Sequence, residues 1–259
     1  MTQLTGLLGI SQGTLVVFLL VLARTTSWAA TAPLFGARGV PPVARLAVGI
    51  ALALFFTPLA AVPDPPQGVL DVVALLAAQS LFGLALGWLT GLWLTAVEMA
   101  GALVDFQSGF SMGALVDPVS GAQSAAFARL ANVSVVALLF ATGGYGAVLD
   151  GFGRSFMAVP VDVMPHVAAG AALTVAHAVT GTMVAAVEIA APLLGVLFLT
   201  EIVLAVAARL TPQANPQAYG LSVKGLVALG TGGTLLAVLP TKAAALLAPA
   251  VHLGGQVLR

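Results

Sequence analysis

The fold is decided by a charge-free run of 26 residues, Val72 to Val97, which reads VVALLAAQSLFGLALGWLTGLWLTAV. A hydrocarbon core about 30 Å thick needs roughly 20 predominantly apolar residues in a helix that crosses it. The run is long enough to cross and holds no Asp, Glu, Lys or Arg. It therefore predicts a membrane-spanning helix.

The composition of the whole chain is that of a membrane protein. Of its 259 residues, 60% are hydrophobic and 7% are charged, and the mean hydropathy is +1.09. Soluble domains carry roughly 25% charged residues. Nine Lys and Arg balance nine Asp and Glu, so no excess of positive charge favours nucleic acid as a partner. The chain has no Cys, which excludes disulfides and thiolate chemistry.

Five further apolar runs predict an all-α integral membrane protein of about six apolar helical segments. No Lys or Arg lies between Met1 and Ala23, so the first run is predicted to be a retained segment and not a cleaved signal peptide. The fifth run is too long for one straight span, and Pro192 with Gly195 predicts either a kinked helix or a helical hairpin. The six segments are Leu7–Leu34, Leu46–Leu59, Val72–Val97, Ala126–Leu149, Ala171–Ala208 and Val223–Leu247.

The connections between these runs are rich in Pro and Gly. None of them is long enough to form a separate soluble domain. Residues 1–259 are therefore predicted to form a single membrane unit.

Gly83, Gly87 and Gly91 are spaced four residues apart. Such a ladder of small residues lets a second helix approach closely and gain van der Waals contact. The spacing does not tell whether that helix belongs to the same chain or to a partner subunit, but it predicts that this face meets protein and not lipid.

Acidic residues lie near or within the apolar runs. A charged side chain at the bilayer centre costs roughly 2.5–3.5 kcal/mol on insertion scales. Glu98 and Asp105 are seven residues apart and share one face if the helix continues past Val97, whereas Glu188 and Glu201 lie about 140° apart on an ideal helix. We expect each to face a subunit interface or a water-filled crevice, although a proton-coupled transporter or a channel would use such groups too.

The stretch from Glu98 to Pro118 reads EMAGALVDFQSGFSMGALVDP. It is too polar for a helix face exposed to lipid and too apolar for a free aqueous loop. Irregular backbone at membrane depth persists only where protein or a cavity surrounds it. The stretch therefore favours a re-entrant or pore-facing segment, with an interfacial linker as the alternative.

Gly109 to Gly113 matches the G-x-S-x-G pattern, which in hydrolases exposes a Ser between a strand and a helix. No strand is predicted before it, and His166, His177 and His252 show no spacing that nominates a base or a metal ligand. A serine hydrolase through Ser111 is a distant possibility. No catalytic residue, metal or cofactor is expected, and no phosphate-binding G-x-x-x-x-G-K-[ST] loop is present.

Short motifs follow one another along nearly the whole chain. They are Arg24, Ala32-Pro33-Leu34-Phe35, Val40-Pro41, Pro58, Glu98-Met99-Ala100-Gly101, Asp105 to Ser111, Asp117-Pro118, Ser155-Phe156, Pro160, Arg209, Pro212-Gln213-Ala214-Asn215, Gly220 and Lys224. In their order and spacing they resemble the FliR family of flagellar type III export-gate proteins, whose injectisome relatives are called SctT. The chain departs from that family at Pro216 to Tyr219, where members usually carry a more apolar run, and at Ser222-Val223, where they usually carry a Pro.

The resemblance implies a non-enzymatic subunit that is built of helical hairpins in a heteromeric helical assembly. It implies FliP-like and FliQ-like partners, FlhB-like and FlhA-like proteins nearby, and exported unfolded proteins as cargo. Export energy would come from a cytosolic ATPase and the proton-motive force. The implied location is the bacterial inner (cytoplasmic) membrane, in the flagellar basal body. The Asp105 to Ser111 and Asp117-Pro118 blocks favour the flagellar branch.

The resemblance also implies a plug-like loop at about residues 101–120 that closes the export channel. A Gly-rich loop that carries Phe and Met can exclude water from a pore and still yield to a passing chain. The pore plug residues are Phe106, Gln107, Gly109, Phe110, Ser111 and Met112. The polar interface or gate residues are Glu98, Asp105, Asp117, Glu188, Glu201, Arg209, Asn215 and Lys224.

The alternative function is a proton-coupled secondary transporter of a small solute that uses Glu98, Asp105 or Glu188. Transporter folds usually show inverted repeats with matching broken helices. No such repeat is visible in this sequence.

Overall fold

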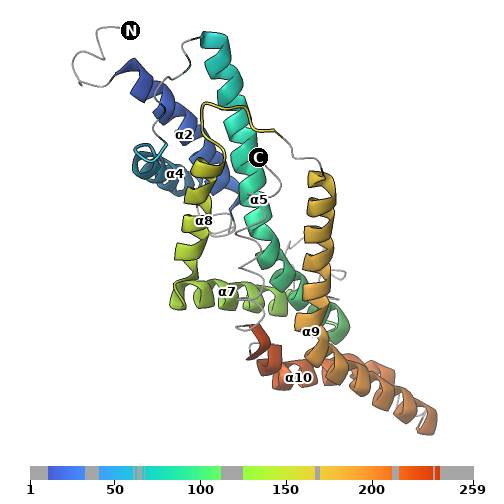
Figure 1. Ribbon diagram of the computed structural model, residues 1–259. Coiled ribbons are helices and arrows are strands. Elements are labelled where there is room, and N and C mark those ends of the chain that lie inside the picture. The colour runs from blue at the N-terminus through green and yellow to red at the C-terminus, as the bar shows by residue number, and fades with distance from the viewer. Residues whose placement is uncertain are drawn as a thin grey trace. The chain divides into compact units, whose positions relative to one another are not determined.

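The computed structural model describes residues 11–32, 41–60, 62, 66, 68–111, 125–166, 170–211, 216–235 and 237–239. Helices dominate this part of the chain, and no strand occurs in it (Figure 1). The helices are α2 (Gln12–Thr31), α4 (Pro42–Phe56), α5 (Val69–Ser108), α7 (Ala126–Ala141), α8 (Gly144–Ala158), α9 (Ala171–Leu210) and α10 (Pro216–Thr231). The predicted all-α class is confirmed.

The helices pack as two compact units that are interleaved along the sequence. Unit 1 holds α2, α4, α5 as far as Leu92, α8, and α9 as far as His177. Unit 2 holds α5 from Trp93, α7, α9 from Ala178, and α10. Neither unit is a contiguous stretch of sequence, so the single membrane unit expected from the sequence has this internal division.

Helix length and hydropathy make α2, α5, α9 and the segment Tyr219–Leu239 candidate membrane spans, and the bent pair α7 and α8 adds a fifth if it is counted as one. Both α5 and α9 have 40 residues, a length of about 60 Å at 1.5 Å per residue. That is roughly twice the thickness of a bilayer's hydrocarbon core. Six apolar segments therefore do not correspond to six simple crossings.

The fifth apolar run is one helix, α9, which contains Pro192. Of the two alternatives left open by the sequence, the hairpin is wrong. Figure 1 shows the α9 ribbon changing direction about midway. Proline explains the bend, because it lacks the N–H that would bond to the preceding turn and its ring clashes there.

The fourth apolar run, Ala126–Leu149, is not one helix as expected. It breaks into α7 and α8, which are bent by 79°. Gly143 lies at the break with φ +70° and is the N-cap of α8. Only glycine adopts this left-handed conformation without steric cost, so the Gly143-Gly144 pair was the missed signal in the sequence.

The third run is longer than predicted, because α5 continues to Ser108. Residues 101–108 are therefore helical, and the irregular backbone expected from about residue 101 begins at Gly109. The continued helix keeps Glu98 and Asp105 on one face, as their spacing of seven predicts.

The core of unit 1 is aromatic where α2, α4 and α8 meet. Trp28 stacks on Phe152 with 4.3 Å between ring centroids, and Phe56 packs against Phe152 and Phe156 at 5.6 and 5.3 Å. Each of these four side chains is at least 95% buried. Aromatic pairs of this kind contribute about 0.5–1.5 kcal/mol beyond the area that they bury.

The glycine ladder of α5 packs against α2 of the same chain. A Cβ at Gly83 would overlap the backbone carbonyl of Arg24, and a Cβ at Gly87 would lie 2.8 Å from that of Trp28. The two backbones thus approach more closely than any larger residue allows. Gly91 follows on the same helix and is half-buried.

This close approach predicts that Gly83→Ala destabilises the protein. The methyl group meets the Ser27 hydroxyl and also the backbone carbonyl of Arg24, which cannot turn aside as a side chain can. Helix separation should therefore cost about 1–3 kcal/mol, as for other overpacked cores. The matched control is Gly181→Ala in α9, where a Cβ meets nothing within 4 Å. Thermal unfolding in detergent should show a lower midpoint for Gly83→Ala only. Equal midpoints would contradict the packing described here.

Candidate functional site

A buried cation lies at the centre of unit 1. The side chain of Arg24 on α2 has no exposed surface. Its Nε donates to Oε1 of Gln79 on α5 at 2.7 Å, and Nη2 donates to the same oxygen. Nη1 and Nη2 also donate to the backbone oxygens of Ser155 and Val159, at 3.2 and 2.9 Å. The guanidinium thus joins α2, α5 and the end of α8.

Aromatic rings and a second amide complete this cluster. The guanidinium carbon lies 4.5 Å from the centroid of the Phe82 ring and 4.7 Å from that of Phe156, within the range of a cation–π interaction. The amide nitrogen of Gln79 donates to the backbone oxygen of Val161 at 3.0 Å. Gln79 was not among the predicted site residues, although an amide inside a charge-free run was a visible signal.

In unit 2, Asp105 connects the end of α5 to the start of α7. Its carboxylate accepts hydrogen bonds from the backbone nitrogens of Phe127 and Ala128, both at 2.9 Å. The residue is 2% exposed. Ala125, at the N-cap of α7, offers no side-chain acceptor, so the carboxylate of Asp105 takes its place.

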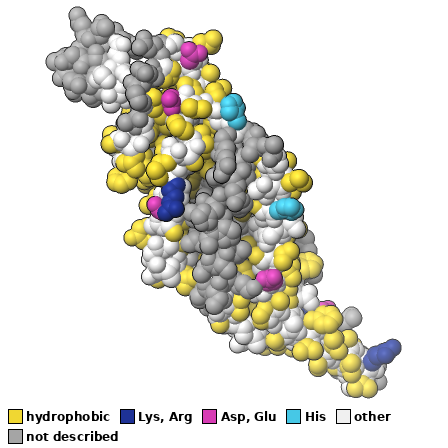
Figure 2. Space-filling model, viewed as in Figure 1, with side chains coloured by type: hydrophobic (Ala, Val, Ile, Leu, Met, Phe, Trp, Pro, Cys, Tyr) yellow, Lys and Arg dark blue, Asp and Glu magenta, His cyan; other side chains and the backbone are white. Residues whose placement is uncertain are grey.

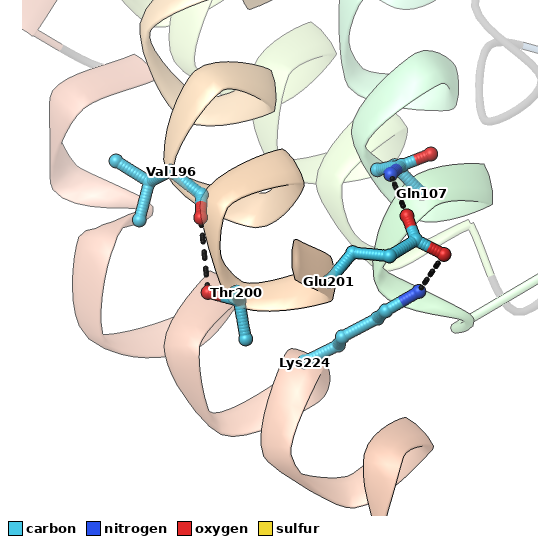
Figure 3. A network of polar contacts seen from close by, with 5 residues as sticks. All are labelled: Gln107, Val196, Thr200, Glu201 and Lys224. Atoms are coloured by element: carbon cyan, nitrogen blue, oxygen red, sulfur yellow. Dashed lines mark hydrogen bonds and ion pairs between the residues drawn. The ribbon is translucent and has the colours of Figure 1, made fainter. Parts of the chain in front are cut away.

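Glu201 on α9 joins α5 to α10 (Figure 3). One carboxylate oxygen accepts from Nε2 of Gln107 at 2.8 Å, and the other pairs with Nζ of Lys224 at 3.0 Å. Figure 3 shows Gln107 and Lys224 approaching the carboxylate from different helices. The structure therefore brings together three predicted residues, and Glu201 is satisfied within its own chain.

Glu98 is also engaged inside unit 2. Its carboxylate accepts a hydrogen bond from the amide of Asn132 on α7. Sequence reasoning did not single out Asn132. The sequence did mark Asn132 as an amide within an apolar helical run, as it marked Gln79. It did not show that Asn132 would meet Glu98.

The predicted plug residues that the structure describes do not share one environment. Phe106 is 76% exposed at the end of α5. Phe110 lies in the following turn and packs against Phe127 with 5.9 Å between centroids. Gly109 makes this turn at φ +87°, and Ser111 donates its N–H to the backbone oxygen of Asp105 at 3.3 Å.

The remaining predicted residues are not brought together. Glu188 and Arg209 are both exposed on α9. Met112, Asp117 and Asn215 lie outside the described residues. Within the described ranges no group of three or more His, Asp or Glu could hold a metal ion. The G-x-S-x-G pattern follows a helix, α5, where a nucleophile elbow requires a strand.

The described surface is largely apolar. Figure 2 shows hydrophobic side chains spread over this face with only a few charged ones between them. Unit 2 contributes many of the exposed large side chains. On α9 and α10 they include Phe198, Leu199, Ile202, Val203, Val206, Leu210, Tyr219, Leu221, Leu226 and Leu229.

Comparison with known proteins gives a consistent result. The family described as "Bacterial export proteins, family 1" matches residues 15–249. The chain is 33% identical to the flagellar biosynthetic protein FliR of Bacillus subtilis (strain 168) over 80% of its own length and 81% of that relative. It is 25% identical to FliR of Pectobacterium carotovorum subsp. carotovorum, over 84% and 83%. It is 27% identical to the Yop proteins translocation protein T of Yersinia pestis, over 71% of each chain.

The buried cluster predicts that Arg24→Met destabilises the protein. The change leaves Oε1 of Gln79 and the Val159 carbonyl without the guanidinium donor, and each buried polar group left unpaired costs about 1–3 kcal/mol. The control is Arg154→Met, because Arg154 makes a 2.7 Å i,i+4 pair with Asp150 and its side chain is 64% exposed. Such pairs contribute about 0.3–0.5 kcal/mol.

Unfolding in detergent, followed by tryptophan fluorescence, compares the two variants. Arg24→Met should lower the midpoint well beyond Arg154→Met. If both variants unfold alike, the Arg24 cluster does not hold unit 1 together.

Proposed function

The chain belongs to the bacterial export proteins of family 1, and from this membership we propose that it is a non-enzymatic core subunit of the flagellar type III protein export gate. With FliP-like and FliQ-like partners it forms the channel through which unfolded flagellar proteins pass. Its location is the inner (cytoplasmic) membrane at the flagellar basal body. FlhB-like and FlhA-like proteins are its further neighbours.

Similarity to named relatives supports the flagellar assignment. The 33% identity to FliR of B. subtilis covers four-fifths of both chains, whereas similarity to the Yersinia translocation protein is lower and covers less. Both relatives are named for flagellar biosynthesis or for protein translocation. Export is therefore the shared activity, and flagellar biogenesis is the branch that the similarity favours.

The observation that carries this proposal combines length and surface. The helices α5 and α9 are longer than one bilayer crossing requires, and they expose large apolar side chains. The 40 residues of α5 and of the bent α9 each extend for about 60 Å along the helix axis, about twice what one crossing of a hydrocarbon core of about 30 Å requires. Unit 2 nevertheless exposes large apolar side chains such as Phe198 and Leu210 on α9. Exposed apolar patches of this extent mark surfaces for a partner or for lipid. Partner subunits that cover the parts beyond the bilayer satisfy both facts.

Co-expression with FliP-like and FliQ-like proteins of the same bacterium tests the assembly. We expect a tagged version of this chain to co-purify with both as one stable complex in mild detergent. Gly181→Ala, which disturbs no contact, should assemble equally well and serves as a control for substitution in α9. Purification of the chain without either partner would count against the whole proposal.

The transporter alternative is less well supported. It needs carboxylates that face a solute, but two of its three candidates, Glu98 and Asp105, are directed at α7, one to Asn132 and one to backbone N–H groups. The third candidate, Glu188, is exposed on α9. The two functions differ in what the chain does alone. A transporter moves a small solute when reconstituted by itself, whereas an export subunit requires its partners.

We further propose that the turn after α5 contributes to the seal of the channel. Phe106 is the strongest candidate among the described residues, since it is 76% exposed at the helix end. Phe110 packs on Phe127, so it holds the turn in place as well as adding apolar surface. A constriction lined by apolar side chains blocks ions by excluding water.

Deletion of residues 107–113 tests the seal. The deletion removes the last two residues of α5, including the Gln107 partner of Glu201, together with the turn. Because it leaves the exposed faces of α9 and α10 intact, the complex should still assemble and should leak ions. Conductance of the reconstituted complex measures the leak, and the amount of co-purified partner measures assembly. Assembled complexes with unchanged conductance would remove the plug assignment and leave the export-gate assignment standing.

A further inference from the structure

The start of α7 depends on a side chain from another helix. The first backbone N–H groups of an α-helix have no partner within the helix, and a side chain at the N-cap usually accepts one of them. Ala125 cannot do so. Asp105 supplies two oxygens, each 2.9 Å from a backbone nitrogen, at Phe127 and Ala128. The carboxylate therefore both caps α7 and joins it to α5.

Two further contacts hold the same two helices together. A Cβ at Gly101 would overlap the backbone of Ala128, so α5 and α7 approach closely one turn before Asp105. On the other side, the rings of Phe110 and Phe127 pack with 5.9 Å between centroids, and Phe127 is 3% exposed. Asp105 lies between these contacts.

The backbone of Asp105 also organises the turn that follows. Its carbonyl oxygen accepts from the N–H of Ser111 and from the hydroxyl of Ser108, both at 3.3 Å. The same residue therefore contacts α7 through its side chain and the turn through its main chain. Phe106 and Gln107 follow it directly, and Gln107 donates to Glu201.

We propose that Asp105 is a positioning residue that fixes the turn after α5 against the start of α7, so that Phe106 and Phe110 occupy one defined place in the closed channel. This inference rests on the proposed sealing function. A carboxylate suits the role because it accepts two hydrogen bonds at once and its charge is favourable at a helix N-terminus. A buried carboxylate persists only when it is satisfied in this way.

The experiment separates a tether between helices from a simple helix cap. It uses the assembled complex and three variants: Asp105→Ala, Asp105→Asn, and Asp105→Ala combined with Ala125→Asp. The double variant gives α7 a cap of its own but does not restore the link to α5. The control is Gly181→Ala in α9, where the added methyl group meets nothing within 4 Å and Asp105 keeps its contacts.

Ion conductance and the amount of co-purified partners are measured for each variant. Loss of the two hydrogen bonds that link the Asp105 carboxylate to α7 corresponds to about 1–2 kcal/mol, or a roughly 5- to 30-fold change in population, so we expect Asp105→Ala to raise the leak by about that factor. Asp105→Asn should leak less, because its amide keeps one acceptor oxygen. The double variant should assemble and still leak.

Two results would overturn the proposal. In the first, the double variant seals like the unsubstituted complex, which means that Asp105 serves α7 only as a cap. In the second, none of the Asp105 variants leaks while deletion of residues 107–113 does, which means that the seal exists without this anchor. If the deletion itself does not leak, the sealing function fails and this inference fails with it.

If Asp105→Ala prevents assembly, Asp105→Asn and the double variant are used to test the proposal. Sealing by both of them, at normal assembly, overturns the proposal in the same way. A leak from the double variant supports it, since α7 is then capped and only the link is missing.

Discussion

The guanidinium of Arg24 sets the strongest constraint on unit 1. A buried charge is very costly unless its hydrogen bonds are made, and among the described residues no carboxylate pairs with this one. It is satisfied by an amide, by backbone carbonyls at and just beyond the end of α8, and by two aromatic faces. Because these groups come from three helices, the cation fixes their arrangement. Carbonyls at a helix C-terminus carry partial negative charge, which suits them to the task.

In unit 2 three acidic groups link helices, of which Asp105 is buried and Glu98 and Glu201 are exposed. Glu98 pairs with Asn132, Asp105 with backbone N–H groups, and Glu201 with Gln107 and Lys224. In each case the partner comes from another helix of the chain. Hydrogen bonds between apolar helices specify which helices pack together, which apolar side chains do less well because lipid tails are equally apolar. Five charged side chains among the described residues thus link helices: Arg24, Glu98, Asp105, Glu201 and Lys224.

Much of the fold was predictable from the sequence, because apolar runs of helical length have few alternatives in a membrane. Two boundaries were placed correctly, at Ala126 and Ala171. The break at Gly143 was missed because hydropathy continues across it, although the glycine pair marks a turn. The extension of α5 to Ser108 was missed because Gly101 and Asp105 suggest irregular backbone, while contacts with α7 stabilise the helix there.

Site residues were harder to predict than the fold, since a sequence shows that a polar residue is present but not which partner it meets. Glu201 and Lys224 were selected separately, and their separation of 23 positions in the sequence gave no sign that they pair. Gln79 and Asn132 were passed over because neutral amides attract less attention than charges. In an apolar protein, however, a buried amide also requires a hydrogen-bond partner. An amide side chain within an apolar run should therefore be treated as a candidate contact between helices, whereas a hydroxyl can bond to the backbone of its own helix, as Thr200 does with Val196.

On the proposed function, the predicted plug residues illustrate why a seal needs both fixed and exposed groups. Phe110 is held against Phe127, and Asp105 holds the turn to α7, whereas Phe106 is largely exposed at the helix end. An aromatic ring without a fixed support would seal different places at different times, and one packed entirely within its own chain would leave the pore open. On the proposed function, the polar anchor defines the position and the exposed ring supplies the apolar surface. The position of the seal is then set by hydrogen bonds, while its yielding to cargo depends on apolar contacts that are easily exchanged.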